Sequence, residues 1–176
     1  MDEKVASVLR KASEAWRDVM AIYAGAMCSA QILEGELVQV LYFLRIKSGE
    51  LKEPGFDWAY HQMMRQKPSE VLDWIRGAGG NLSYENEKII RQALRLRNFL
   101  AHEFFHKHNP VMSGTQCKQI ASKLKKIDAE LETAFELLQP LRQKLETQLG
   151  LSVDRQITST NFQKRFVEAF ESFNDE

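Results

Sequence analysis

The chain has 176 residues, of which 44% are hydrophobic and 27% are charged, as is typical of a folded globular protein. Its 24 Lys and Arg residues equal its 24 Asp and Glu residues in number, which excludes a general electrostatic attraction to nucleic acid. Any contact with phosphates therefore requires a local basic surface. At this length we expect one domain, over residues 1–176, with a core of its own.

The first residues, MDEKVASVLRKASEAW, carry charges throughout and contain no apolar signal segment. No run in the chain approaches the ~18 apolar residues of a membrane span. Cys28 and Cys117 lie far apart within helical patterns, which indicates thiols in a reducing compartment rather than a disulfide. We therefore expect a cytoplasmic protein without membrane contacts.

The first predicted element is one long helix over about residues 3–47. Its apolar residues follow a heptad pattern, with steps of four and three. They are Val5, Leu9, Ala12, Trp16, Val19, Tyr23, Ala26, Ala30, Leu33, Leu37, Val40 and Leu44. A break near Gly25 is the alternative, because a helical pattern of this length is unusual.

Residues 48–80 are predicted to be broken into short pieces. The segment SGELKEPG (48–55) is a turn, and WAYHQMM (58–64) is expected to form one or two helical turns. A short helix follows, beginning at Pro68 and closed by Gly77 and the glycine pair at 79–80.

Two further long helices are predicted, over about 83–108 and 116–149. Ser83 is suited to cap the first, and Asn109-Pro110 ends it. Thr115 is the expected N-cap of the second, which should stop at Gly150 and kink at Pro140. Its heptad pattern runs through Cys117, Ile120, Leu124, Ile127, Leu131, Ala134, Leu138, Leu141, Leu145 and Leu149.

The last predicted element is an amphipathic helix over about 161–173, with Phe162, Phe166, Phe170 and Phe173 on one face. We interpret it as a docking or partner-binding appendage. No stretch alternates with the period of a strand. The expected fold is all-α, an antiparallel helical bundle built on three long helices plus shorter helices.

A helical wheel divides the helix over 83–108 into two faces. The expected core face contains Ile89, Ile90, Ala93, Leu96, Leu100, Ala101 and Phe104. The opposite, polar face contains Lys88, Arg91, Arg95, Asn98, His102, His106 and Asn109, with Phe99 as its one apolar member. No acidic residue occurs from Lys88 to His102. Such a basic ridge predicts a surface for phosphates and bases, and a merely solvated helix face is the alternative.

Arg97 is the exception on this helix, because the wheel places it near the centre of the apolar face. A guanidinium in a core requires a partner, so we expect a carboxylate such as Glu34 or Glu36 to meet it. Otherwise this face is a cleft or subunit interface, or a local distortion of the helix turns Arg97 toward His102.

The string Arg97-Asn98-Phe99-Leu100-Ala101-His102 resembles the R-x4–6-H motif of the HEPN superfamily, including its favoured polar residue after the arginine. Members are small helical bundles, and many are metal-independent endoribonucleases of toxin–antitoxin and phage-defence systems. The resemblance implies RNA as substrate, a homodimer with a composite cleft, and a cognate antitoxin or regulatory protein as partner. It covers one helix closely and the rest of the chain only as an all-α bundle.

Carried onto this sequence, the motif assigns catalysis to Arg97, Asn98 and His102. Arg95 also fits, at the longer spacing, and the sequence does not decide between the two arginines. Lys88, Arg91, Arg95, Phe99 and His106 are expected to contact the substrate. One toxin branch has a modified tyrosine two residues after the histidine; here that position is Phe104, so the chain departs from that branch.

The implied chemistry needs no cofactor. Imidazole titrates near neutral pH, so His102 can take or give a proton, and arginine binds phosphate oxygens through a bidentate fork. The expected product carries a 2′,3′-cyclic phosphate.

Two other interpretations stay open. HEFFH, at 102–106, matches the HExxH zinc motif with Glu103 as base, but residues 107–112 supply no third ligand. Glu130, Glu132 and Glu136 are candidates without any local signature, so no metal site is expected. Alternatively, the chain is an inactive HEPN-like bundle that binds a partner, and His102 is an interface histidine.

Overall fold

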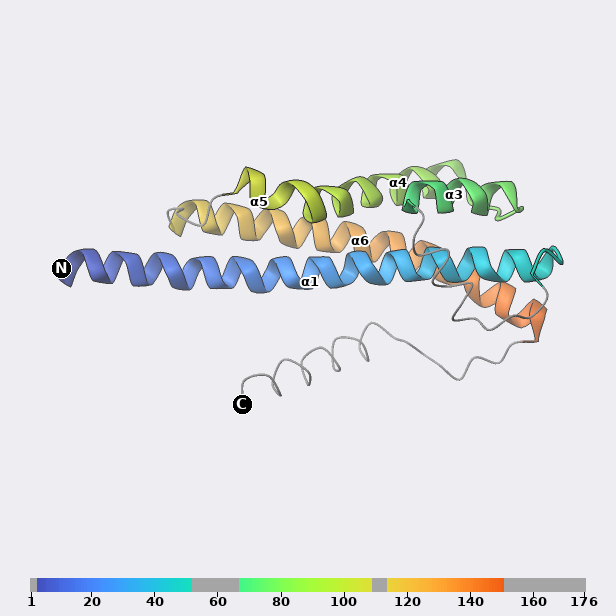
Figure 1. Ribbon diagram of the computed structural model, residues 1–176, viewed down its shortest axis with the longest axis horizontal. Helices are drawn as coiled ribbons and strands as arrows, with labels where there is room; N and C mark the ends of the chain where they lie inside the picture. Colours follow the sequence, from blue (N-terminus) through green and yellow to red (C-terminus); the bar gives the residue numbers. More distant parts are fainter. Residues whose placement is uncertain (1–2, 52–66, 109–113, 151–176) are drawn as a thin grey trace.

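The computed structural model describes residues 3–51, 67–108 and 114–150 (Figure 1). Every regular element within these ranges is helical, which confirms the all-α prediction. The helical turns expected at 58–64 and the aromatic helix expected at 161–173 lie outside the described residues. None of the helices described has the length of unbroken apolar sequence that a membrane span requires.

The two longest helices follow the heptad patterns. Helix α1 runs over Glu3–Lys47 without a break at Gly25, and helix α6 runs over Gly114–Leu149. Apolar pattern positions of both helices are buried, among them Leu33 and Leu37 in α1 and Leu124 and Leu131 in α6. Their burial explains why two such long helices persist, because most helical stability comes from packing of an apolar face.

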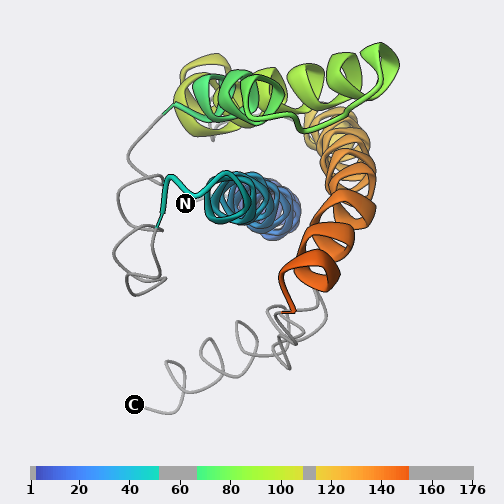
Figure 2. The same cartoon turned by 90° about the vertical axis from the view of Figure 1, so that its right-hand side faces the viewer.

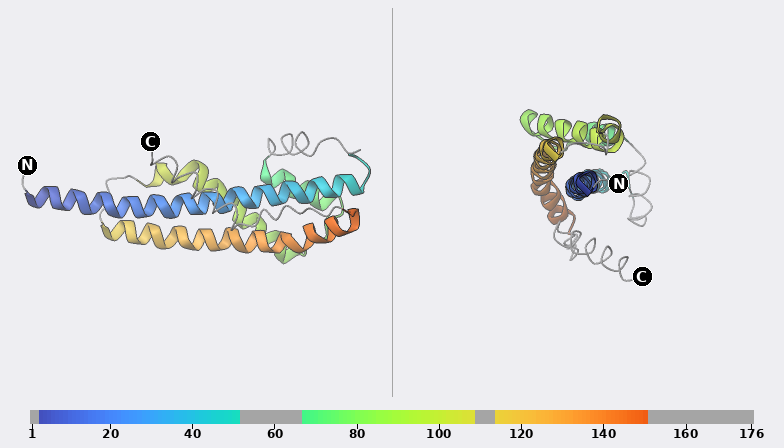
Figure 3. Two further views of the ribbon diagram at one scale, coloured as in Figure 1. Left: turned by 90° about the horizontal axis from the view of Figure 1, so that it is seen from below. Right: turned by 90° about the vertical axis from the view of Figure 1, so that its left-hand side faces the viewer.

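Of the two predicted ends of α6, the C-terminal one is correct and the N-terminal one is not. Gly150 follows the helix with φ of 65°, a left-handed conformation that glycine adopts without a Cβ penalty. Thr115 is not the N-cap, since the helix already includes Gly114. Pro140 lies inside the helix, which bends toward its C-terminal end (Figure 3).

The predicted helix over 83–108 is one helical run with a change of winding in its middle. It consists of α4 (Tyr84–Asn98), a π-helical turn η1 (Phe99–Glu103) and α5 (Phe104–Lys107). The hydroxyl of Ser83 caps the start by accepting the backbone N–H of Asn86 at 3.1 Å, as predicted. In the π turn the N–H of Phe104 donates to the carbonyl of Phe99, five residues earlier.

The π turn corrects the helical wheel. Leu100 and Phe104 are buried as predicted, whereas Ala101 is exposed because the wider turn moves it out of the core. Ile89 was also placed in the core but is 38% exposed, and Leu94, which was not, is buried. Tyr23 of α1 contacts the π turn in two ways. Its hydroxyl donates to the Leu100 carbonyl at 3.1 Å, and its ring stacks on Phe104.

Helix α3, Pro68–Gly77, begins at the predicted proline and buries Val71, Leu72 and Ile75. It is joined to α4 by a tight turn in which Gly79 has φ of 82°. Gly80 lies so close to α3 that a Cβ there would come within 2.5 Å of the Ile75 side chain. The glycine pair is therefore needed to fold α4 back beside α3.

Contacts between the helices set their directions. Glu36 and Lys47 of α1 bond to Arg142 and Gln148 of α6, so these two helices run parallel. Tyr23 of α1 contacts Leu100, whereas Glu34 contacts Arg97. The α4–η1–α5 run is therefore antiparallel to α1. Figure 2 shows α1 covered by α6 on one side and by α3 and α4 on another, and the bundle is antiparallel only in part.

Candidate functional site

A pocket of about 440 Å³ lies where the start of α3 meets the α4–η1 junction. It gathers four of the residues predicted from the motif, Arg95, Arg97, Asn98 and His102, together with Arg91. Among the described residues, its lining also includes Lys67, Pro68, Ser69, Leu94 and Glu103. The other predicted contact residues, Lys88, Phe99 and His106, do not line it.

The π turn accounts for this convergence. On a regular α-helix, Arg97 and His102 point to different sides. A π turn advances fewer degrees per residue than an α-helix, so His102 is rotated back toward the side of Arg97. Both arginines that fit the motif consequently share one pocket with His102.

Arg97 is held in place by two neighbours. Its Nε forms an ion pair with Oε1 of Glu34, which confirms the expectation that a carboxylate of α1 meets it. Its Nη1 donates to Oδ1 of Asn98 at 3.1 Å. The side chains of Arg97 and Glu34 are 24% and 11% exposed. Glu34 Oε1 is itself buried, and the guanidinium of Arg97 supplies the opposite charge that it requires.

Glu36, the other carboxylate considered, is occupied elsewhere. It accepts a hydrogen bond from Nε of Arg142 at 2.7 Å, and Arg142 also bonds Glu146. Burial raises the pKa of Glu36 against the opposing attraction of Arg142. This pair therefore ties α1 to α6 and has no place in the pocket.

Arg95 and His102 are the unengaged members of the pocket. Both are exposed, and neither makes a hydrogen bond or ion pair with a residue in the described ranges. An exposed guanidinium and an exposed imidazole that line one pocket can both contact a ligand there. The lack of such a bond at His102 also means that no described side chain orients its imidazole.

Arg91 has its guanidinium committed to carboxylates. It donates to Oε1 of Glu87 at 2.9 and 2.7 Å and to Oδ1 of Asp73 at 2.5 Å, and these hydrogen bonds raise its pKa. The Glu87 contact has the i, i+4 spacing that the sequence displays, whereas Asp73 comes from α3 and has no local signal. Arg91 therefore shapes the pocket wall more than it offers a free charge.

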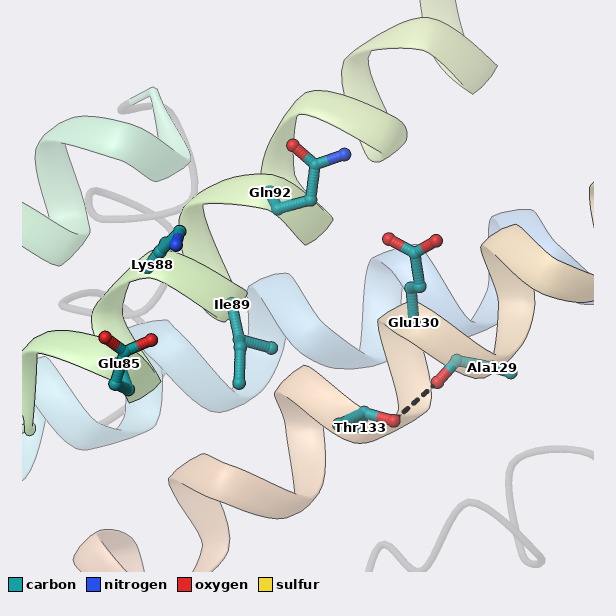
Figure 4. A pocket seen from close by; sticks show the side chains of 7 residues that line it. All are labelled: Glu85, Lys88, Ile89, Gln92, Ala129, Glu130 and Thr133. Atoms are coloured by element: carbon teal, nitrogen blue, oxygen red, sulfur yellow. Dashed lines mark hydrogen bonds between the residues drawn. The ribbon is translucent and has the colours of Figure 1, made fainter.

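Lys88, a predicted substrate contact, lines a different pocket. Figure 4 shows it on α4 with Glu85, Ile89 and Gln92. These residues and residues of α6 line a groove of about 460 Å³. The α6 side consists of Ala129, Glu130 and Thr133, and the Thr133 hydroxyl donates to the Ala129 carbonyl at 2.8 Å. The groove includes Ile89, whose exposure the wheel did not predict.

Phe99 points to the α6 side rather than into the pocket of His102. Its ring lies 5.4 Å from Nζ of Lys107 and 5.0 Å from Nζ of Lys123, measured to the ring centroid. It also meets Phe104 and His108 edge-on. The helical wheel indicated Phe99 but neither lysine, and Lys123 lies on another helix.

The HExxH residues do not gather further ligands. Within the described ranges no three side chains of His, Cys, Asp or Glu lie together as a metal site requires. Glu103, the base of that interpretation, accepts a hydrogen bond from Nζ of Lys107 at 2.6 Å, which lowers its pKa. Glu130 lies in the groove between α4 and α6 instead.

The chemistry available in the pocket of His102 is thus proton transfer by an imidazole beside guanidinium groups. No family model matches the chain, and no curated protein or solved structure matches it.

Proposed function

We propose that the chain is a metal-independent endoribonuclease of HEPN type that uses His102 and an arginine. The observation that supports this most strongly is the shared pocket of Arg95, Arg97, Asn98 and His102. These residues lie on a helix that carries no acidic residue from Lys88 to His102. The proposed domain is one bundle over residues 1–176 built on three long helices, acting in the cytoplasm without a cofactor.

In the proposed reaction the imidazole of His102 takes the proton of a ribose 2′-OH. The 2′-oxygen then attacks phosphorus, and the bond from phosphorus to the 5′-oxygen breaks. The products are a 2′,3′-cyclic phosphate and a 5′-hydroxyl, whose proton comes from a second acid. A guanidinium stabilises the charge on the phosphorane, and Asn98 hydrogen-bonds the phosphate.

Because Arg97 forms an ion pair with Glu34, we propose Arg95 rather than Arg97 as the main phosphate ligand. A guanidinium neutralised by a nearly buried carboxylate offers less charge to a phosphate than an exposed one. Arg97 then serves as a positioning residue, because its Nη1 fixes the amide of Asn98.

A homodimer is part of the proposal, since the described lining of one pocket contains one histidine and the reaction needs both a base and an acid. Two pockets facing one another would let the second His102 protonate the leaving oxygen. Light scattering at micromolar concentration should give twice the chain mass. A fully active monomer would rule this arrangement out. A cognate antitoxin or regulatory protein is the further partner proposed.

The central experiment compares purified wild type and His102→Ala on RNA in excess chelator. We expect wild type to cleave and to leave 2′,3′-cyclic phosphate ends, and His102→Ala to be inactive with an unchanged melting temperature. Cleavage that stops in chelator and returns with added zinc would revive the HExxH interpretation. Full activity of folded His102→Ala would end the ribonuclease proposal. Expression of wild type, but not of His102→Ala, should slow growth of the host.

One observation favours a second candidate function, an inactive bundle that binds a partner. A catalytic histidine is usually oriented by a hydrogen-bonding neighbour, and His102 has none among the described residues. In that case Arg97 and Glu34 only join α4 to α1. Absence of cleavage by a folded dimer, with a partner captured on the α4 face, would support this candidate.

A further inference from the structure

The charges of this neutral chain are separated along its sequence. Residues 88–127 contain 9 of the 24 Lys and Arg residues but only 1 of the 24 Asp and Glu residues. This stretch therefore has a formal net charge of +8, and the remainder of the chain has −8. A field of one sign over part of a neutral molecule attracts an oppositely charged ligand to that part alone.

In the fold, the described part of this stretch covers the α4–η1–α5 run from Lys88 onward and α6 up to Ile127, the two arms of a helical hairpin. The two arms lie side by side in Figures 1 and 2. The pocket of His102 lies on the side of the first arm that faces α3. The lysines of the second arm, Lys118, Lys123, Lys125 and Lys126, are all exposed.

The two arms meet at Phe99. Lys107 from α5 and Lys123 from α6 both place their ammonium groups within 5.4 Å of the centroid of its ring. Lys126 follows Lys123 by three residues and so continues the same face of α6. We call Lys107 and Lys123 at the Phe99 ring, together with Lys126 one turn further along α6, the hairpin cluster.

The charge of the hairpin cluster is poorly neutralised. Glu103 accepts a hydrogen bond from Lys107, but both side chains of that pair are more than half exposed, so water screens it. Burial lowers the pKa of the adjacent His108, and the nearby charges of Lys123 and Lys107 lower it further. The two ammonium groups lie near one aromatic ring, and their charges disfavour the protonated form of His108. A site that disfavours a further positive charge is suited to an anion.

We propose that the hairpin cluster binds the phosphate backbone of an RNA whose scissile bond lies in the pocket of His102. This inference rests on RNA being the ligand of that pocket, and it adds a substrate class. The substrate is an RNA strand or stem long enough to reach from the pocket of His102 across η1 to the hairpin cluster, rather than a mononucleotide or dinucleotide.

RNA fits the cluster better than an acidic protein does. Protein interfaces bury an apolar centre, whereas this surface consists of lysines with a half-buried aromatic ring. Phosphate contacts need only charge at regular intervals along a helix face, which Lys123 and Lys126 provide.

The test measures affinity rather than cleavage. The full chain carrying His102→Ala is titrated against a fluorescent single-stranded RNA of about 20 nucleotides, between about 50 and 200 mM salt. Into this background we place Lys123→Gln, Lys107→Gln and, as the matched control, Lys144→Gln. Lys144 is also an exposed lysine of α6, but it lies outside the basic hairpin.

We expect Lys123→Gln and Lys107→Gln each to weaken binding about threefold to tenfold, and the salt slope to fall by about 0.7 for each phosphate that the protein no longer neutralises. Lys144→Gln should bind as its parent does, and Lys123→Arg should retain the affinity. The inference is overturned if both test variants match the control while their melting temperatures are unchanged. It is equally overturned if they weaken binding of a polyglutamate peptide but not of RNA.

The inference and the ribonuclease proposal fail in different ways. If wild type cleaves no RNA but binding still depends on Lys123, the hairpin cluster stands and the catalytic proposal falls. If wild type cleaves RNA and substitution of Lys123 and Lys107 leaves the affinity unchanged, the catalytic proposal stands and the hairpin cluster falls.

Discussion

Replacing Arg97 by alanine should destabilise the fold, because the substitution leaves Glu34 without its partner. Glu34 lies on α1 with 11% of its side chain exposed, and Arg97 crosses to it from α4. Breaking a buried ion pair by removing one partner costs about 3 to 5 kcal/mol. A quarter of the Arg97 side chain is exposed, so water will partly solvate the carboxylate and we expect about 3 kcal/mol.

Urea unfolding followed by circular dichroism measures this effect. With a slope of about 2 kcal/mol per molar urea, the midpoint of Arg97→Ala should fall by about 1.5 M. Arg95→Ala is the control, because an exposed side chain without a described partner should change stability by less than about 0.5 kcal/mol. Glu34→Gln introduced together with Arg97→Ala should recover at least about 1 kcal/mol of the loss, since the uncompensated charge is then gone.

Cleavage by the same proteins separates structure from chemistry. Arg95→Ala should fold normally and lose activity, whereas Arg97→Lys should lose stability and activity together because lysine lacks the planar fork. The reasoning is refuted if Arg97→Ala unfolds at the wild-type midpoint and is inactive. In that case Arg97 is the phosphate ligand and its contact with Glu34 contributes nothing to the fold.

Three further predictions concern the stability of the helical run that contains η1. Tyr23→Phe removes the hydrogen bond to the Leu100 carbonyl and should cost about 1 kcal/mol in urea unfolding; no change would mean that the bond does not hold the π turn. Ser83→Ala removes the cap of α4 and should also cost about 1 kcal/mol, whereas the control Ser122→Ala should be neutral. Burial lowers the pKa of His108 in the folded chain, so its contribution to stability is present above the unfolded value of about 6.5 and is lost as the pH falls through the lower folded pKa. His108→Gln should flatten this dependence, and an NMR titration midpoint at or above 6.5 would contradict it.

Local patterns were sufficient to predict the two longest helices and the starts of α3 and α4. The heptad positions of α1 and α6, such as Leu33 and Leu124, are periodic in sequence and buried in the bundle. The cap at Ser83 and the start at Pro68 depend on adjacent residues only. The carboxylate for Arg97 was also predictable, because a guanidinium on an apolar face demands one and α1 contains few buried candidates.

The helical wheel predicted burial wrongly at positions where the packing of neighbouring helices decides which side chain is covered. Ile89 and Leu94 are equally apolar, but α4 lies so that Leu94 faces the core and Ile89 borders the groove to α6 (Figure 4). The parallel course of α1 and α6 depends on contacts such as Glu36 with Arg142, 106 positions apart. A single-helix pattern contains no information on either point, because both depend on where the partner helix is placed.

A local distortion of this helix was one alternative that the sequence left open, but nothing in the sequence identified it as a π turn, and removing the turn tests what it does. Such a turn is an α-helix with one residue inserted, so deleting the exposed Ala101 should restore regular winding and keep Phe104 in the core. We expect the deletion to change stability by about 1 kcal/mol, mainly through the bond from Tyr23 to Leu100. His102 would, however, move with respect to Asn98 and the arginines, and a misplacement of even ~1 Å costs about 100-fold in rate. Ala101→Ser, which retains the length, should keep both properties. If the deletion variant cleaves RNA at the wild-type rate, the winding of η1 does not position His102; if it loses far more stability than Tyr23→Phe, the turn serves the packing of Phe104 instead.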